Sequence, residues 1–220
     1  MKKNTLLCIL VSFVFLFLSC TANTPESDPY TLSYPGTRWG MTPEEAFKAL
    51  KPDESDFVEE RTFETSVAPV YVMVLYTTLF GAEAKTTFEF YDFSGNGHYQ
   101  LDEIIAVFPQ NADMDSVKNA MVSNYGMPTS EDLSLVKLTW ESVGQLQDFL
   151  SEKDKELFIT NNPSRLSEPA TTIKLFTYGG IYDFLTYKDE PTTNYLQFSS
   201  NAYMRSGSWF ADNDIPEQAS

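Results

Sequence analysis

The sequence predicts an α+β domain in which helices pack on one face of an antiparallel sheet or sheets. Residues 43–50 and 113–125 carry helix start signals, and a third such signal follows residue 141. Stretches rich in aromatic and β-branched residues separate and follow these segments, as expected for strands. Helices interspersed with strands in this order are typical of the α+β class. Two similar halves, 38–128 and 129–210, are an alternative within that class.

The chain begins with a segment typical of exported proteins. Lys2 and Lys3 give it a positive start, and residues 6–18 are apolar except for Ser12. A helix of that length covers about 20 Å, less than the roughly 30 Å hydrocarbon core of a bilayer. We therefore predict that residues 1–19 are a signal peptide and not a permanent membrane span.

The end of this segment, Phe17-Leu18-Ser19-Cys20, resembles the processing site of bacterial lipoproteins. In that class a leucine-rich tripeptide with a small last residue precedes a cysteine that is acylated, for example with palmitate, and becomes residue one. The resemblance implies that Cys20 is lipidated and anchors the protein to a membrane of the cell envelope, outside the cytoplasm. Each buried methylene contributes about 0.8 kcal/mol, so two or three chains form a durable anchor. There are two alternatives. The signal could be cleaved to release a soluble protein, or it could stay uncut as an anchor.

Residues 20–37 are expected to form a tether between this anchor and the domain. They are rich in threonine, serine and proline and have no apolar periodicity. Such a segment reaches at most about 55 Å when fully extended. The folded domain is expected over 38–210, followed by a polar, flexible tail at 211–220.

Charge and cysteine content exclude several classes of function. The chain has 31 acidic and 15 basic residues and a net charge of −16. Such a surface repels nucleic acid, which is therefore excluded as a partner. Cys8 lies in the signal peptide and Cys20 at its end, so the mature domain has no disulfide and no thiol chemistry.

The first helix is predicted over residues 43–50. Thr42 is its capping residue, Pro43 occupies the first helical position, and Glu45 completes a capping box. Pro52 ends the helix. A charged connection is expected to follow it.

Strands are expected next at residues 70–80, 86–91 and 101–108. The second of these alternates phenylalanines with polar neighbours, as a half-buried strand does. Residues 94–97 read Ser-Gly-Asn-Gly and predict a turn, so residues 86–108 are expected to form a β-hairpin.

A second helix is predicted at residues 113–125, with Asp113 or Asp115 as its cap and Gly126 after its last residue. A strand is expected at 133–140. Next, Ser142 and Gln145 suggest a capping box that opens a helix reaching residue 150 or 158. The last third predicts an antiparallel meander of three strands, at 171–178, 181–187 and 195–199, separated by Gly179-Gly180 and by residues 188–194.

Two short segments resemble parts of small exported α+β modules. Trp39-Gly40-Met41-Thr42, with Glu45-Ala46 and Leu50, is similar to the opening helix of the barrel-assembly lipoprotein and of the β-lactamase-inhibitor-protein type of fold. Residues 125–128, Tyr-Gly-Met-Pro, resemble their helix stop, and residues 90–97 resemble their strand end and glycine turn. The first helix departs from the pattern by ending without glycine. The resemblance implies the fold class and a protein-binding role, and carries over no binding residue.

A calcium loop is one candidate site. Asp92, Ser94, Asn96 and Glu103 occupy oxygen-ligand positions of the twelve-residue calcium-binding loop, with Gly97 at its glycine position. That loop requires a helix on each side, whereas the flanking sequence here alternates as strands. A hairpin turn in which Asn and Gly adopt positive φ is therefore the favoured interpretation.

Catalytic signatures are sparse. His98 is the only histidine, and neither a Gly-x-Ser-x-Gly elbow nor a zinc-binding HExxH pair occurs. Acidic pairs could support an exported hydrolase if a cleft raised their pKa values. They are Glu44-Glu45, Glu59-Glu60, Asp102-Glu103 and Asp189-Glu190.

The sequence thus favours a non-enzymatic lipoprotein with no cofactor, which is held to the membrane through Cys20 and binds an envelope protein or a glycan. Tyrosine and tryptophan gather in the last third and suit either contact, although strand cores also use them. A hydrolase and a calcium-binding module are the alternatives.

Overall fold

The computed structural model describes residues 32–65, 68–92, 95–132, 137–150, 152, 155–156, 159, 163–183 and 188–200. The predictions for the signal peptide, for Cys20 and for the tail at 211–220 lie outside these residues. The helices of the described part are α2 (Pro43–Leu50), α3 (Met114–Tyr125) and α4 (Leu146–Phe149), with short 3₁₀-helices at Glu54–Asp56 and Pro163–Ser167. Its strands are β1 (Phe57–Glu64), β2 (Pro69–Leu79), β3 (Ala82–Tyr91), β4 (Gln100–Phe108), β5 (Ser130–Asp132), β6 (Lys137–Glu141), β7 (Thr171–Asp183) and β8 (Lys188–Ser200).

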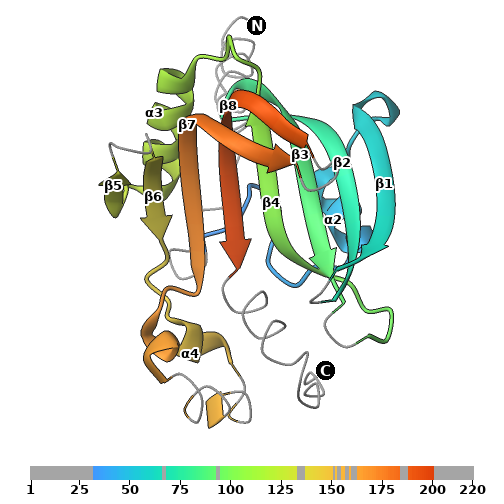
Figure 1. Cartoon of the computed structure of the whole chain (residues 1–220), viewed down its shortest axis with the longest axis vertical. Helices are drawn as coiled ribbons and strands as arrows, with labels where there is room; N and C mark the ends of the chain where they lie inside the picture. The colour runs from blue at the N-terminus through green and yellow to red at the C-terminus, as the bar shows by residue number, and fades with distance from the viewer. Residues whose placement is uncertain are drawn as a thin grey trace, which may run out of the picture.

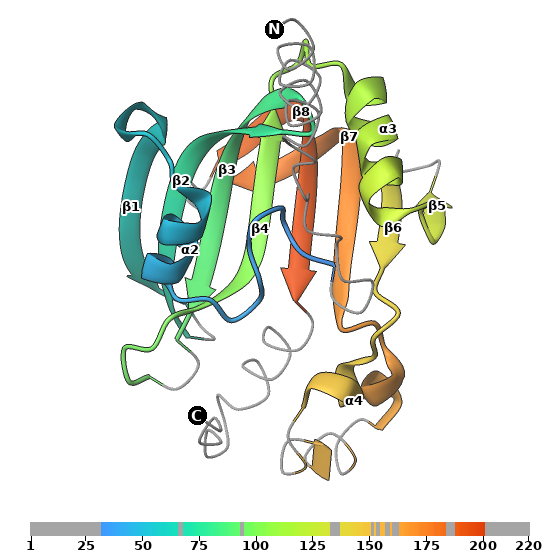
Figure 2. The same cartoon turned by 180° about the vertical axis from the view of Figure 1, so that it is seen from behind.

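The described strands form one eight-stranded antiparallel sheet in the order β1-β2-β3-β4-β8-β7-β6-β5 (Figure 1). The α+β class is therefore confirmed, with much more strand than helix. Figure 2 shows α2 and α3 in front of the same face of this sheet. None of the helices in the described part is long and apolar enough to cross a bilayer.

The main core is one buried cluster that includes residues of these two helices and of the sheet. Ala46 of α2 and Val117 and Met121 of α3 belong to one buried cluster with side chains from strands on both sides of the sheet centre. Strand residues in that cluster include Met73, Leu75, Phe88, Phe90, Ile104, Phe108, Trp140, Ile173, Leu196 and Phe198. Because side chains alternate along a strand, the residues between them point to the opposite face. There Val70, Val72 and Val74 form a second, smaller cluster with Phe63 and Tyr91.

The folded domain begins earlier than residue 38. Leu32 and Tyr34 are 5% and 4% exposed. The Leu32 amide donates to Thr171 Oγ1 at 2.9 Å, and the Tyr34 ring meets Phe88 edge-on at 5.3 Å between centroids. Leu32 and Tyr34 are thus part of the core and not of the tether. The surrounding Pro, Ser and Thr residues obscured this apolar pair in the sequence.

Both long helices have the ends that their sequences predict. In α2 the Glu45 amide donates to Thr42 Oγ1 and the Thr42 amide to Glu45 Oε2, which completes the capping box. In α3 the cap is Asp113, whose Oδ1 accepts from the Ser116 amide at 3.1 Å. Gly126 follows α3 with φ of 80°, a conformation that glycine adopts without strain.

The charged connection after α2 contains a strand that the sequence interpretation missed. β1 pairs antiparallel with β2 and is an edge strand of the sheet. Six of its eight residues are exposed, so it shows no alternation of apolar and polar positions. The predicted β-hairpin is confirmed, since β3 and β4 pair along their length.

The predicted cap of the helix after Ser142 is wrong. The predicted helical stretch to residue 158 is only partly described, since residues 152, 155, 156 and 159 are helical and those between them lie outside the description. Ser142 Oγ donates to the Gly144 carbonyl and accepts from the Thr171 amide, 29 residues away. Gln145 precedes α4 instead, and its amide donates to Asp148 Oδ2 at 2.9 Å. The α4 helix has only four residues. Of the preceding strand prediction, residues 133–136 lie outside the description and β6 covers 137–141.

The three-stranded meander is also wrong. β7 and β8 form a single long hairpin of 13 residues in each strand. Gly179-Gly180 lie inside β7, where the register with β8 shifts on both sides of Gly179. Glycine in the interior of a strand is common at such bulges. The Gly-Gly pair therefore bends β7 without ending it. Residues 188–194, expected to be a connection, belong to β8.

Candidate functional site

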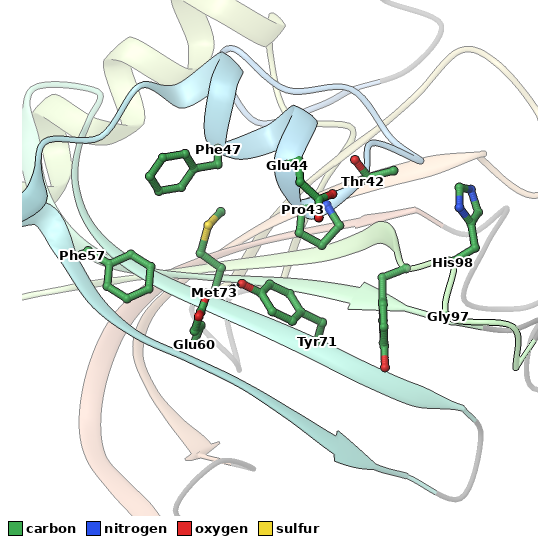
Figure 3. A pocket seen from close by; sticks show the side chains of 11 residues that line it. Thr42, Pro43, Glu44, Phe47, Phe57, Glu60, Tyr71, Met73, Gly97 and His98 are labelled. Atoms are coloured by element: carbon green, nitrogen blue, oxygen red, sulfur yellow. Dashed lines mark hydrogen bonds between the residues drawn. The ribbon is translucent and has the colours of Figure 1, made fainter.

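A groove of about 670 Å³ lies where α2 passes over the edge of the sheet (Figure 3). Its lining comes from four separate segments: the start of α2, β1, β2, and the connection between β3 and β4. They contribute Thr42, Pro43, Glu44, Phe47, Phe57, Glu60, Tyr71, Met73, Gly97, His98 and Tyr99. Because β1 is at the edge, no further described strand borders the groove on that side.

The apolar part of the groove consists of aromatic rings around a methionine. Phe47 and Phe57 are 45% and 37% exposed, which is unusual for phenylalanine. The rings of Tyr71 and Tyr99 lie 6.1 Å apart between centroids. Met73, 2% exposed, closes the groove from the core side. Exposed aromatic side chains next to a cavity are typical of binding sites.

The polar part of the groove is acidic. The Tyr71 hydroxyl donates to Glu60 Oε2 at 2.5 Å, and Glu44 lies at the start of α2. Burial, followed by the hydrogen bond and charge of Glu60 and the charge of Glu44, raises the pKa of Tyr71. This hydroxyl therefore stays protonated at neutral pH. None of the described residues that line the groove is a lysine or an arginine.

His98 stands at the rim of the groove. Its side chain is exposed, and its backbone amide donates to Asn96 Oδ1 at 3.0 Å. No nucleophile hydroxyl is paired with it among the hydrogen bonds of the described residues. The structure thus places it as a rim residue of the groove, which agrees with the expectation of a solvated turn histidine.

The calcium-loop residues are divided between two environments. The Asp92 carboxylate accepts from the backbone amides of Asn96 and Gly97 at 3.3 and 2.6 Å, so it organises the turn. Glu103 lies in β4 and accepts from Gln197, and Ser94 is outside the described residues. Within the described residues no group of three or more His, Cys, Asp or Glu side chains is arranged to hold a metal ion. These contacts favour the hairpin turn.

A second polar cluster lies on the sheet face away from the helices. Glu89 of β3 is directly opposite Glu103 of β4. Burial, with repulsion from Glu103, raises the pKa of Glu89 to about 7, although a hydrogen bond from the Tyr91 hydroxyl at 3.0 Å lowers it. Burial also raises the pKa of Glu103, against the opposing effects of Gln197 and Lys174.

In the three acidic pairs whose side chains are described, the residues that are adjacent in sequence lie in different environments; the side chains of Asp189 and Glu190 lie outside the description. Glu45 caps α2 and forms an ion pair with Arg38 at 3.0 Å, whereas Glu44 lines the groove. Glu60 lines the groove, and its neighbour Glu59 pairs in register with Val74. The carboxylate that Glu103 meets is Glu89, because neighbours along a strand point to opposite faces while residues in register lie side by side.

Comparison with known proteins gives no family. No family model, no curated protein and no solved structure matches the chain. The properties of the groove must therefore be derived from its own residues. An acidic, aromatic groove that is open at a sheet edge can accept an apolar and cationic group.

Sequence reasoning missed this groove because it missed β1. The groove requires Phe57 and Glu60 on that strand, facing Tyr71 and Met73 on β2. The signal that could have found it is the β-rich composition of Phe57, Val58, Thr62 and Phe63 within the charged segment.

Proposed function

We propose that this protein is a non-enzymatic bacterial lipoprotein, attached through Cys20 to the outside of a cell-envelope membrane, which binds a partner macromolecule in the groove beside α2. The single observation that supports binding is the groove itself, which is lined by two partly exposed phenylalanines, a half-buried tyrosine and two carboxylates. A protein partner suits this lining better than a neutral glycan, because the groove offers unpaired negative charge beside its rings.

We further propose that the domain consists of two similar halves that share one sheet. The first half is α2 followed by β1–β4, and the second is α3 followed by β5–β8. The sheet order is consistent with a two-fold axis through its centre, since each half contributes four strands in sequence order from the edge inward and β4 pairs antiparallel with β8. The boundary would then fall between β4 and α3, and not at residue 128.

Site-specific photo-crosslinking tests the binding proposal. A photoreactive amino acid replaces Phe57 or Phe47 in the groove, and a matched variant carries it at Val143, which is 72% exposed and lies outside the groove. Irradiation of intact envelopes is expected to give a defined adduct from the two groove positions only. Equal adducts from position 143, or none from the groove, would contradict the proposal.

The anchor has a separate test. Mass spectrometry of the detergent-extracted protein is expected to show an acylated N-terminus at Cys20. The Cys20→Ser variant is expected to leave the membrane fraction. An intact Met1, or an unmodified start after residue 20, would contradict the lipoprotein assignment.

A further inference from the structure

We infer that the occupant of the groove is a lysine- or arginine-bearing segment of a partner protein, whose cationic group binds between Glu44 and Glu60 against the ring of Tyr71. The inference rests on the proposed binding function and names the chemistry of its ligand. It follows from the charge, the rings and the position of the groove.

The charge of the groove selects a cation. Glu44 and Glu60 are the only carboxylates among the described lining residues. The charge of each raises the pKa of the Tyr71 hydroxyl, so both lie near it. Since that hydroxyl donates to Glu60, it fixes one carboxylate oxygen beside the ring. No described lining residue supplies a positive charge. An incoming cation would balance two negative charges that form no ion pair with the described residues.

The rings suit a cation on a long apolar stem. The faces of aromatic rings attract ammonium and guanidinium groups within about 6 Å of the ring centre. Tyr71 and Tyr99 both line the groove, and the hydroxyl of Tyr71 contacts Glu60. Phe47 and Phe57 offer exposed apolar surface, on which the methylene stem of lysine or arginine can pack.

Charge also argues against a second copy of this chain as the occupant. The net charge is −16, so two copies repel each other. β1, the strand that borders the groove, carries Glu59, Glu60 and Glu64. Pairing of two such edges would bring like charges together, which is unfavourable. A basic segment meets no such repulsion.

Methionine-methyl NMR on the full-length chain tests this inference. Met73 lines the groove, and Met127, 76% exposed and outside it, is an internal reference in the same spectrum. The probes are two capped peptides, acetyl-Ser-Leu-Lys-Leu-Lys-Ser-amide and the same peptide with glutamate in place of lysine. The lysine peptide is expected to shift the Met73 signal and leave Met127 in place, whereas the glutamate peptide shifts neither.

Charge variants identify the carboxylates that act. Glu60→Gln and Glu44→Gln are each expected to weaken lysine-peptide binding about fivefold, as loss of a partly exposed ion pair of about 1 kcal/mol would. Glu59→Gln removes a neighbouring charge of β1 that does not line the groove and is expected to change binding less than twofold. All three residues are exposed, so these variants are expected to fold.

Any of the following outcomes would overturn the inference. Binding of the glutamate peptide, equal effects of Glu59→Gln and Glu60→Gln, or an unmoved Met73 signal would show that the groove does not select a cation. A Met73 signal that shifts with protein concentration alone would identify a second copy as the occupant. If crosslinks from position 57 persist while the lysine peptide fails to bind, the ligand class is wrong and the proposed binding function still stands.

Discussion

Glu89 and Glu103 face each other across β3 and β4 on the side of the sheet that α2 and α3 leave uncovered. Two carboxylates in register on neighbouring strands repel each other when both are charged. Burial strengthens this effect and raises the pKa of both groups. One of the two side chains therefore holds a proton at mildly acidic pH, and the stability of the domain depends on pH through this pair.

The first prediction concerns that dependence. Folding raises the pKa of Glu89 from 4.5 to about 7, so the folded state binds a proton that the unfolded chain has released. The free energy of unfolding is thus expected to fall as the pH rises from about 4.5 to about 7. Glu89→Gln removes this penalty and is expected to stabilise the domain at pH 8 by up to about 3 kcal/mol.

Urea denaturation of both proteins between pH 4 and pH 8 measures this effect. Glu83→Gln is the matched control, because Glu83 is an exposed residue of the same strand. Parallel pH profiles for the wild type and Glu89→Gln would contradict the prediction.

The second prediction concerns the start of the domain. Tyr34 is 4% exposed and contacts the rings of Phe88 and Phe198. Tyr34→Ala is expected to destabilise the domain by about 3 kcal/mol, because it leaves a cavity in the main core. Tyr76→Ala, at a position that is 58% exposed, is expected to cost less than about 0.5 kcal/mol. Similar urea midpoints for the two variants would place residue 34 outside the core.

The third prediction concerns the cap of α2. Thr42 Oγ1 accepts from the Glu45 amide, and Thr42 also lines the groove. Thr42→Ala is expected to cost about 1 kcal/mol of stability, whereas Thr42→Ser keeps the hydroxyl and restores most of it. Thermal denaturation compares the two variants. Equal losses from Ala and Ser would show that the methyl group of Thr42, and not its hydroxyl, is what matters.

The fourth prediction concerns Ser142, which links the segment after β6 to the start of β7. Its hydroxyl accepts from the Thr171 amide at 3.1 Å and donates to the Gly144 carbonyl. Ser142→Ala is expected to cost 1–2 kcal/mol, since it leaves buried polar groups without these bonds. Hydrogen exchange of the Thr171 amide is expected to accelerate. Val143→Ala, at an exposed neighbour, is the control and leaves that exchange unchanged.

Local signals explain why the helices were predicted well. The capping box of α2 and the cap and glycine stop of α3 each lie within a few residues, so the sequence displays them directly. The Ser142 prediction failed for the converse reason. Its hydroxyl is used by the Thr171 amide, a partner that no local pattern reveals.

Strands were predicted less well because their order and ends depend on tertiary contacts. β1 is mostly exposed and keeps its place through pairing with β2, so it lacks an apolar period. The glycines of β7 looked like a turn, although pairing with β8 continues past them. The groove needs four segments that only the fold brings together. Neither it nor the Glu89–Glu103 pair could be read from adjacent residues.

The pairing of β4 with β8 at the centre of the sheet constrains how the chain can fold. Ile104 and Phe198 are partners in register, yet Phe198 is almost the last described residue to leave the ribosome. Until it arrives, β4 is an apolar edge with free backbone groups, which invites aggregation. Contacts this distant in sequence also form slowly. Strands β1–β4 would therefore need protection until β8 has been made, and a chain truncated before β8 is expected to aggregate or be degraded and not to form a smaller working protein.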